Sequence, residues 1–154
     1  AAVDKMKQVK ASARRYDDVV VDTAGRLDNV SLSLAAAADA VLLPSSYSPD
    51  DILPTLKVIR SLREAGVAGS KIAIVFCRTG GSRAQEVQAR SVLAMNDVAA
   101  LDVSMPQKDG YVALFATGRT GRESPNPYLR RAALAVEEAL ADFVDEAAAP
   151  QKAA

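Results

Sequence analysis

The sequence contains no histidine and no tryptophan, and its single cysteine is Cys77. The lack of histidine excludes histidine general bases and histidine metal ligands. One cysteine excludes an internal disulfide framework and a self-contained thiolate cluster. No apolar run approaches the roughly 20 residues of a membrane span, and no stretch has the pattern of a signal peptide. The expected compartment is therefore a reducing cytoplasm.

The formal net charge is zero, with 19 basic and 19 acidic residues among 154. No global field therefore draws the chain to nucleic acid or to anionic lipid. The charge is nevertheless segregated along the chain. Seven acids and one base lie between Asp17 and Asp51, whereas seven bases and two acids lie between Lys57 and Arg90. This segregation leaves room for a basic face on a neutral protein.

Expected strands and helices alternate along the chain, which has the length and composition of one globular domain. The predicted strands are Val19–Val21, Asp39–Pro44, Lys71–Cys77 and Ala99–Val103. Helices are predicted over Ala1–Arg15 and Ser31–Asp39, and from the cap residue Ser48 to Gly66. A further helix is predicted after the cap residue Ser82, and a short helical turn at Val112–Thr117. The last predicted helix has these residues on one face: Leu129, Ala133, Val136, Leu140 and Phe143. The helix after Ser82 is predicted to bury Ala84, Val87, Ser91 and Ala94. The alternation indicates a three-layer α/β fold with a mostly parallel sheet flanked by helices.

The chain is organised around the stretch Tyr16–Gly25, YDDVVVDTAG. Val19–Val21 is a β-branched run that is apolar on both faces, which is typical of a parallel strand buried on both sides. Asp22 follows where open α/β sheets bind ligands, and a carboxylate there can orient a magnesium ion and its waters. Gly25 lets the backbone approach a phosphate. The alternative interpretation is a buried strand that ends in a turn aspartate.

The order of five motifs resembles the ParA/MinD family of partition and positioning ATPases, and is closest to the ParA-type plasmid and chromosome partition proteins. These motifs are YDDVVVDTAG, ADAVLLPSSYSPDD, KIAIVFCRTG, SMPQKDGYVALFATGRTG and NPYLRRAALAVEEAL. The resemblance implies a P-loop NTPase-like domain over residues 1–146, followed by a flexible tail at 147–154. It also implies ATP and Mg²⁺ as cofactors, a homodimer, nonspecific DNA binding near the nucleoid, and a centromere-binding ParB-like partner that stimulates hydrolysis.

The resemblance assigns roles by position. Asp22 is similar to the Walker B aspartate that holds Mg²⁺ through water, and Thr23, Ala24 and Gly25 are similar to the switch that senses the γ-phosphate. Asp22 and Thr23 are thus the predicted catalytic residues. The resemblance assigns the family's adenine pocket to Cys77, Arg78, Met105, Pro106 and Gln107. Asp22 is accordingly expected to share one pocket with the loops that contain Arg78 and Pro106.

The same resemblance implies a DNA-facing surface. Arg83 lies near the family's nonspecific DNA-binding arginine, and further DNA-facing charge falls on Arg119, Arg122, Arg130 and Arg131. The alternative is that these arginines only solvate a face of the protein. For Cys77, a small residue at a strand end is favoured over a reactive thiol.

The sequence departs from the family at its phosphate loop. The family's Gly-rich loop cradles phosphates and carries lysines, but Gly80-Gly81-Ser82 and residues 118–121 lack lysine. The chain thus resembles the later part of a ParA-like protein and is expected to be inactive alone. Without the family's Walker A strand, Val19–Val21 would have an unpaired flank, so the isolated chain is expected to be unstable, or its N-terminal part cut, disordered or supplied elsewhere.

Other functions remain open at this level. One is a cargo- or division-site-positioning ATPase of the same superfamily, and another is a catalytically silent interaction module. The acidic stretch Asp145–Pro150 argues against the basic membrane helix of MinD-type proteins. The single cysteine disfavours iron-protein reductases, which bridge a cluster with two cysteines per subunit.

Overall fold

The computed structural model describes residues 2–23, 27–80 and 82–149. The elements in chain order are α1 (Ala2–Ser12), α2 (Asn29–Ala37), β1 (Val41–Ser45), α3 (Pro49–Glu64), η1 (Gly69–Lys71), β2 (Ile72–Thr79), α4 (Arg83–Ala94), β3 (Ala99–Pro106), α5 (Asp109–Ala116), η2 (Gly121–Glu123) and α6 (Pro127–Ala148). The three strands form an all-parallel sheet in the order β1-β2-β3. The α/β class and the parallel sheet flanked by helices are therefore confirmed.

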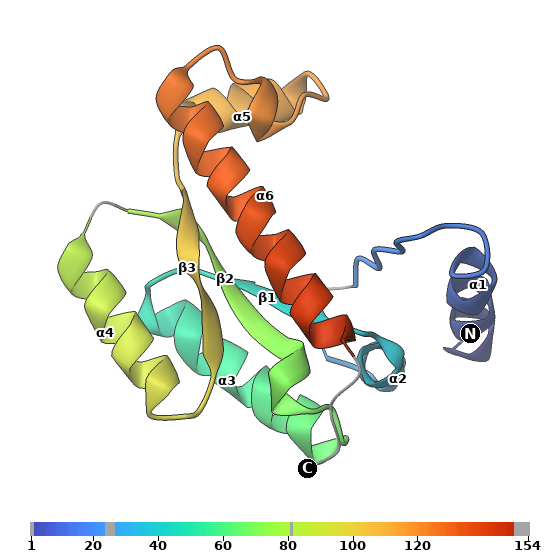
Figure 1. The fold of residues 1–154 in the computed structure, drawn as a ribbon. Coiled ribbons are helices and arrows are strands. Elements are labelled where there is room, and N and C mark those ends of the chain that lie inside the picture. The colour runs from blue at the N-terminus through green and yellow to red at the C-terminus, as the bar shows by residue number, and fades with distance from the viewer. Residues whose placement is uncertain (1, 24–26, 81, 150–154) are drawn as a thin grey trace.

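The central strand β2 is buried along most of its length. Every residue from Ile72 to Phe76 is buried, and Ile74 and Phe76 have no exposed surface. A strand that is covered on both faces needs apolar side chains on both, and this run supplies them. The residues of β2 divide between two cores: one lies against α3 and α4, and the other against α6. Figure 1 shows α6 crossing one face of the sheet while α3 and α4 cover the other.

The limits of α3 follow from its local chemistry. The Ser48 side chain accepts a hydrogen bond from the backbone N–H of Asp50 at 3.2 Å, and Pro49 opens the helix. At the other end, Gly66 takes a left-handed φ of 87°, and the N–H of Val67 bonds to the carbonyl of Leu62 at 3.0 Å. The predicted start and end of this helix are confirmed.

The chain after β3 forms a small unit, the head, which comprises α5, η2 and the start of α6 (residues 109–133). Its core contains Tyr111, Leu114, Leu129 and Ala133. The buried Tyr111 hydroxyl donates to the carbonyl of Leu129 at 2.6 Å. A Cβ atom at Gly121 would lie 2.7 Å from the Cβ of Ala133, so only glycine fits there without a shift. Figure 1 shows the head at one end of α6, beyond the end of the sheet.

The prediction of a buried strand at Val19–Val21 is wrong. The segment pairs with no other described residue, and the exposed fractions of its three valines are 37, 95 and 40%. A β-branched run needs a neighbouring strand to become part of a sheet, and among the described residues β1 pairs with β2 alone. Figure 1 shows the segment as part of an arm that leads from α1 to α2, away from the sheet.

The predicted inner face of α4 is also wrong. Ala84, Ser91 and Ala94 are exposed, and Val87 is 55% exposed. The buried residues are Ala89 and Leu93. The face with Ala89 and Leu93 turns inward because Leu93 joins the core formed by α3 and β2, whereas the predicted face offers two alanines, a serine and a single larger apolar side chain, that of Val87.

The predicted apolar face of the last helix is confirmed. Leu129, Ala133 and Val136 are buried in α6, and Leu140 and Phe143 pack against the second core. The helix continues through Ala148, two residues into the expected tail. Residues 150–154 lie outside the described part of the chain.

Candidate functional site

The carboxyl ends of β2 and β3 meet at one edge of the sheet. Cys77 lies opposite Met105 in the register, and Thr79 lies opposite Pro106. The N–H of Gln107 donates to the carbonyl of Thr79 at 3.1 Å, which joins the two strand ends. The structure thus brings together the residues on which the family's adenine pocket falls. In open α/β sheets this edge is the usual place for a ligand.

A cavity of about 250 Å³ opens beside these strand ends, between β1, β2 and the start of α3. It is lined by Pro44, Ser45, Asp50, Asp51, Pro54, Thr55, Cys77 and Arg78. Small-molecule sites commonly measure about 300–1,000 Å³, so this cavity admits a ligand fragment rather than a whole nucleotide. The backbone of Arg78 has a φ of 52°, a left-handed conformation that is uncommon for a residue with a side chain. Backbone outliers of this kind cluster at ligand sites.

The electrostatics of this cavity are mixed. The Asp51 carboxylate accepts a hydrogen bond from the Ser46 hydroxyl at 2.5 Å, which orients it. The Arg78 side chain is exposed and forms no ion pair with another described residue. Hydrogen-bond acceptors and a cationic donor therefore line one small space. That set suits a polar heterocycle that carries both donors and acceptors.

Several lining residues were not among the predicted site residues. Asp50, Asp51 and Thr55 come from the first turns of α3, and Ser45 ends β1. A usable signal exists in the sequence, because Ser48-Pro49-Asp50-Asp51 starts a helix directly after a strand. In a parallel sheet such a helix must begin at the edge where ligands bind.

The Cys77 thiol is not an activated nucleophile. Burial raises its pKa above the ordinary value, and the nearby Arg78 charge offsets this only in part. A thiol with a raised pKa stays protonated at neutral pH, whereas the thiolate is the reactive form. This agrees with the interpretation of Cys77 as a strand-end residue.

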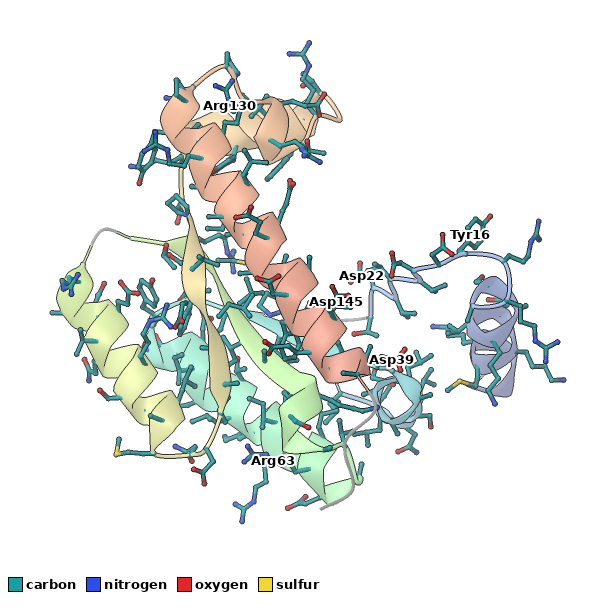
Figure 2. All side chains as sticks on the ribbon, in the orientation of Figure 1. Tyr16, Asp22, Asp39, Arg63, Arg130 and Asp145 are labelled. Carbon is teal, nitrogen blue, oxygen red and sulfur yellow. The ribbon has the colours of Figure 1, made fainter. Side chains whose placement is uncertain are left out.

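Asp22 lies elsewhere. It lines a second cavity, of about 390 Å³, whose lining residues come from α1, the segment at 19–23 and α2: Lys5, Gln8, Val9, Ser12, Val19, Val20, Val21, Asp22, Thr23, Asp28, Val30, Ser31 and Leu34. None of these residues lines the Arg78 cavity. The expected single pocket for Asp22, Arg78 and Pro106 is therefore not formed in this structure, because the segment before Asp22 does not enter the sheet. Figure 2 shows Asp22 on the arm between α1 and α2.

The Asp22 cavity can be tested against a magnesium ion by its donors. The carboxylate of Asp22 and the hydroxyls of Thr23, Ser12 and Ser31 are oxygen groups, the kind that Mg²⁺ prefers. Asp28 is used structurally, since it accepts from the N–H and hydroxyl of Ser31 at 2.8 and 3.0 Å. In the described ranges no three Cys, Asp or Glu side chains converge. The donor set fits a contact with Mg²⁺ through water. The predicted switch residues Ala24 and Gly25 lie outside the described residues.

The predicted DNA-facing arginines fall in two places. Arg83 is the exposed first residue of α4, where the helix dipole disfavours a cation, so its position does not serve helix stability. The others lie in the head. Figure 2 shows Arg130 there. Both places follow the carboxyl end of a strand and thus lie toward the same edge of the sheet.

The head arginines differ in how far they are already engaged. The Nε of Arg122 lies 3.5 Å from Oε2 of Glu137, and Nη1 of Arg130 donates to the carbonyl of Ser124 at 3.4 Å. The pKa of Glu123 is lowered mainly by hydrogen bonds from Thr120, and also by the charges of Arg119 and Arg122. Arg131, like Arg83, forms no ion pair within the described part of the chain. Among the predicted DNA-facing arginines, Arg83 and Arg131 are thus available to an anionic partner without breaking an ion pair to a described residue.

Comparison of the chain with protein-family models, with curated protein sequences and with solved structures finds no match. The family resemblance therefore stays a prediction. A search of the described helices finds none that is both long and apolar enough to cross a bilayer.

Proposed function

We propose that this chain belongs to a partition ATPase of the ParA/MinD type. In this proposal the protein binds ATP with Mg²⁺, dimerises and binds DNA without sequence preference. A centromere-bound ParB-like partner then stimulates hydrolysis, so that plasmid or chromosomal DNA is segregated.

One observation carries the proposal. The segments Cys77–Thr79 and Met105–Gln107 converge at the carboxyl edge of a parallel sheet and are joined by the Gln107–Thr79 hydrogen bond at 3.1 Å. Backbone groups at converging strand ends can hydrogen-bond the edge of a base, and the adjacent cavity supplies apolar walls from Pro44 and Pro54. This arrangement supports the adenine role that the resemblance implies.

The proposal also carries a structural requirement. Asp22 and Arg78 line separate cavities in this structure. The carboxylate that holds the metal at a nucleotide's phosphates must lie close enough to the base pocket for one nucleotide to reach both. The nucleotide-bound protein is therefore expected to hold Val19–Val21 within the sheet, with Asp22 at the strand ends.

The DNA role is tested by retention on duplex DNA in MgATP. Arg83→Ala and Arg131→Ala are expected to weaken binding, and each is expected to lower the slope of log affinity against log salt by about 1. Arg60→Ala is the matched control, because Arg60 is an exposed helical arginine that already faces Glu64 at 3.4 Å. Retention that is unchanged by both substitutions and by raised salt would rule out a DNA role for these arginines.

The separation of the two cavities favours a second candidate, a catalytically silent interaction module. Equilibrium binding of ATP to the 154-residue chain distinguishes the two. The ATPase proposal predicts weak binding, through the base pocket alone, since no lysine-bearing phosphate loop is present. An absence of binding together with an intact fold would favour the interaction module, and micromolar affinity would show that a phosphate site exists elsewhere in the chain.

A further inference from the structure

The head presents aromatic side chains to solvent. The whole chain has four tyrosines and three phenylalanines, and the head contains Tyr111, Phe115 and Tyr128. Tyr111 is buried, whereas Phe115 and Tyr128 are 53 and 62% exposed. Val112, three residues before Phe115 on α5, is exposed as well. Exposed apolar side chains that gather on one small unit mark an interaction site.

The buried Tyr111 joins the two exposed rings. Its ring stacks on that of Phe115, with centroids 6.0 Å apart and planes inclined by 12°. Its hydroxyl donates to the carbonyl of Leu129, the residue after Tyr128, at 2.6 Å. Burial raises the pKa of Tyr111, and the neighbouring Tyr128 phenol raises it further. Both exposed rings are therefore held on one unit, in which Figure 1 shows α5 beside the start of α6.

Each exposed ring has an arginine close by. Arg119 follows Phe115 by four residues, and its backbone N–H donates to the carbonyl of Leu114 at 3.1 Å, at the end of α5. Arg131 follows Tyr128 by three residues on α6, which is the spacing of neighbours on one helix face. Both arginines are exposed, and neither forms an ion pair with another described residue.

Exposed rings beside cationic side chains are typical of surfaces that bind single-stranded nucleic acid. The bases stack on the rings, and the cations contact the phosphates. The charge of the head has the matching sign, since its four arginines outnumber its two acids, Asp109 and Glu123. Glu123 already accepts a hydrogen bond from the backbone N–H of Thr120 at 2.7 Å. A duplex keeps its base faces inside the stack, so it can use the arginines but not the rings.

We propose that the head binds single-stranded DNA, with bases on Phe115 and Tyr128 and phosphates on Arg119 and Arg131. The surface consists of residues from one continuous segment that has a core of its own. This inference deepens the DNA role in the proposed function and rests on it for the choice of DNA as the polyanion. Duplex DNA uses the arginines alone, whereas an unpaired strand uses the rings as well.

The test is fluorescence anisotropy of the 154-residue chain with a labelled oligothymidylate of about 12 nucleotides. Binding is expected to be about fivefold or more tighter than to an abasic strand of the same length, because only the first strand has bases to stack. Phe115→Ala and Tyr128→Ala are each expected to weaken oligothymidylate binding by about fivefold or more and to leave abasic binding unchanged. Arg119→Ala is expected to weaken both and to lower the salt slope by about 0.7.

Tyr16→Ala is the matched control, because Tyr16 is 63% exposed, almost the same as Tyr128. Figure 2 shows Tyr16 on the arm between α1 and α2, apart from Arg130 of the head. The control is expected to change neither affinity, and Tyr128→Phe, which keeps the ring, is expected to bind like wild type. Equal affinity for the two strands, or ring substitutions that act no more strongly than Tyr16→Ala, would overturn the proposal. Displacement of the oligothymidylate by polyglutamate at equal charge would show a surface for acidic protein segments and would overturn it too.

The outcome is separable from that of the duplex experiment. If the rings matter for oligothymidylate while duplex retention ignores Arg83→Ala and Arg131→Ala, the duplex role is wrong and single-strand binding by the head stands. If duplex retention depends on these arginines while the ring substitutions change nothing, the inference about the head fails alone.

Discussion

Arg90 joins α4 to the edge strand β3, and its removal is a sharp test of the packing. Its Nε lies 3.0 Å from Glu86, and its Nη1 donates to the carbonyl of Leu101 at 3.1 Å. The guanidinium lies 5.3 Å from the centroid of the Phe76 ring. The register of β3 against β2 shifts between Ala100 and Ser104, so Leu101 lies in the irregular stretch and Arg90 supplies a partner for its carbonyl.

The expected cost of Arg90→Ala follows from these contacts. A hydrogen bond from a charged donor contributes about 1.5–3 kcal/mol, and a partly exposed cation–π contact about 0.5–1 kcal/mol. The helical ion pair adds about 0.3–0.5 kcal/mol. The Arg90 side chain is 27% exposed, its contacts share one guanidinium group, and its remaining ion pair, with the fully exposed Asp102 at 3.9 Å, adds little. The combined loss is therefore expected to be about 2–3 kcal/mol in the free energy of unfolding.

The assay is equilibrium unfolding in urea, followed by circular dichroism. Arg60→Ala is the control, because Arg60 forms the same kind of pair with Glu64 at 3.4 Å but the two side chains are 83 and 68% exposed. That substitution is expected to cost less than about 0.5 kcal/mol. If the two variants differed by less than about 0.5 kcal/mol, the role assigned to Arg90 would be wrong.

Three further predictions concern the head and the strand ends. Gly121→Val is expected to destabilise the chain by about 1–3 kcal/mol in urea unfolding, because a Cβ at residue 121 lies 2.7 Å from the Cβ of Ala133. Gly80→Ala is the control, since a Cβ at residue 80 meets nothing within 4 Å, and equal effects of the two substitutions would contradict the prediction. The pKa of Glu123 is lowered, so the stability that Glu123 adds relative to Glu123→Gln is present above the ordinary pKa of 4.5 and is lost as the pH falls through the lowered pKa. A difference in urea midpoint between wild type and Glu123→Gln that does not change with pH would refute this assignment. The Cys77 thiol is expected to react with iodoacetamide more slowly than free cysteine at pH 8 and to speed up in urea, and equal rates in buffer would contradict its raised pKa.

Local chemistry in the sequence predicts much of this fold. The cap at Ser48, the apolar run of β2 and the spacing of Leu129, Ala133 and Val136 each act over a few residues. The alternation of elements then leaves few topologies for the sheet. The convergence of Arg78 with Pro106 follows from the same rule, since parallel strands end at the same edge.

The remaining features depend on residues far apart in the chain. Val19–Val21 has the composition of a strand, but a strand forms only where a partner edge is available. The buried side of α4 depends on which residues reach Phe76 and the core of α3, and spacing alone does not decide between two faces. The Arg90–Leu101 contact depends on an irregular register in β3. Asp22 lies apart from Arg78 for the same reason, because the segment Val19–Val21 that precedes it does not pair within the sheet.

The base pocket at the strand ends is the central claim of this account. Titration of the isotopically labelled chain with adenosine, followed by amide NMR shifts, tests it most directly, with cytidine as the matched control. The account predicts saturable shifts at Cys77–Thr79 and at Gln107 with adenosine, weak in affinity and reduced by Arg78→Ala. Shifts absent from these residues, or equal for the two nucleosides, would contradict it.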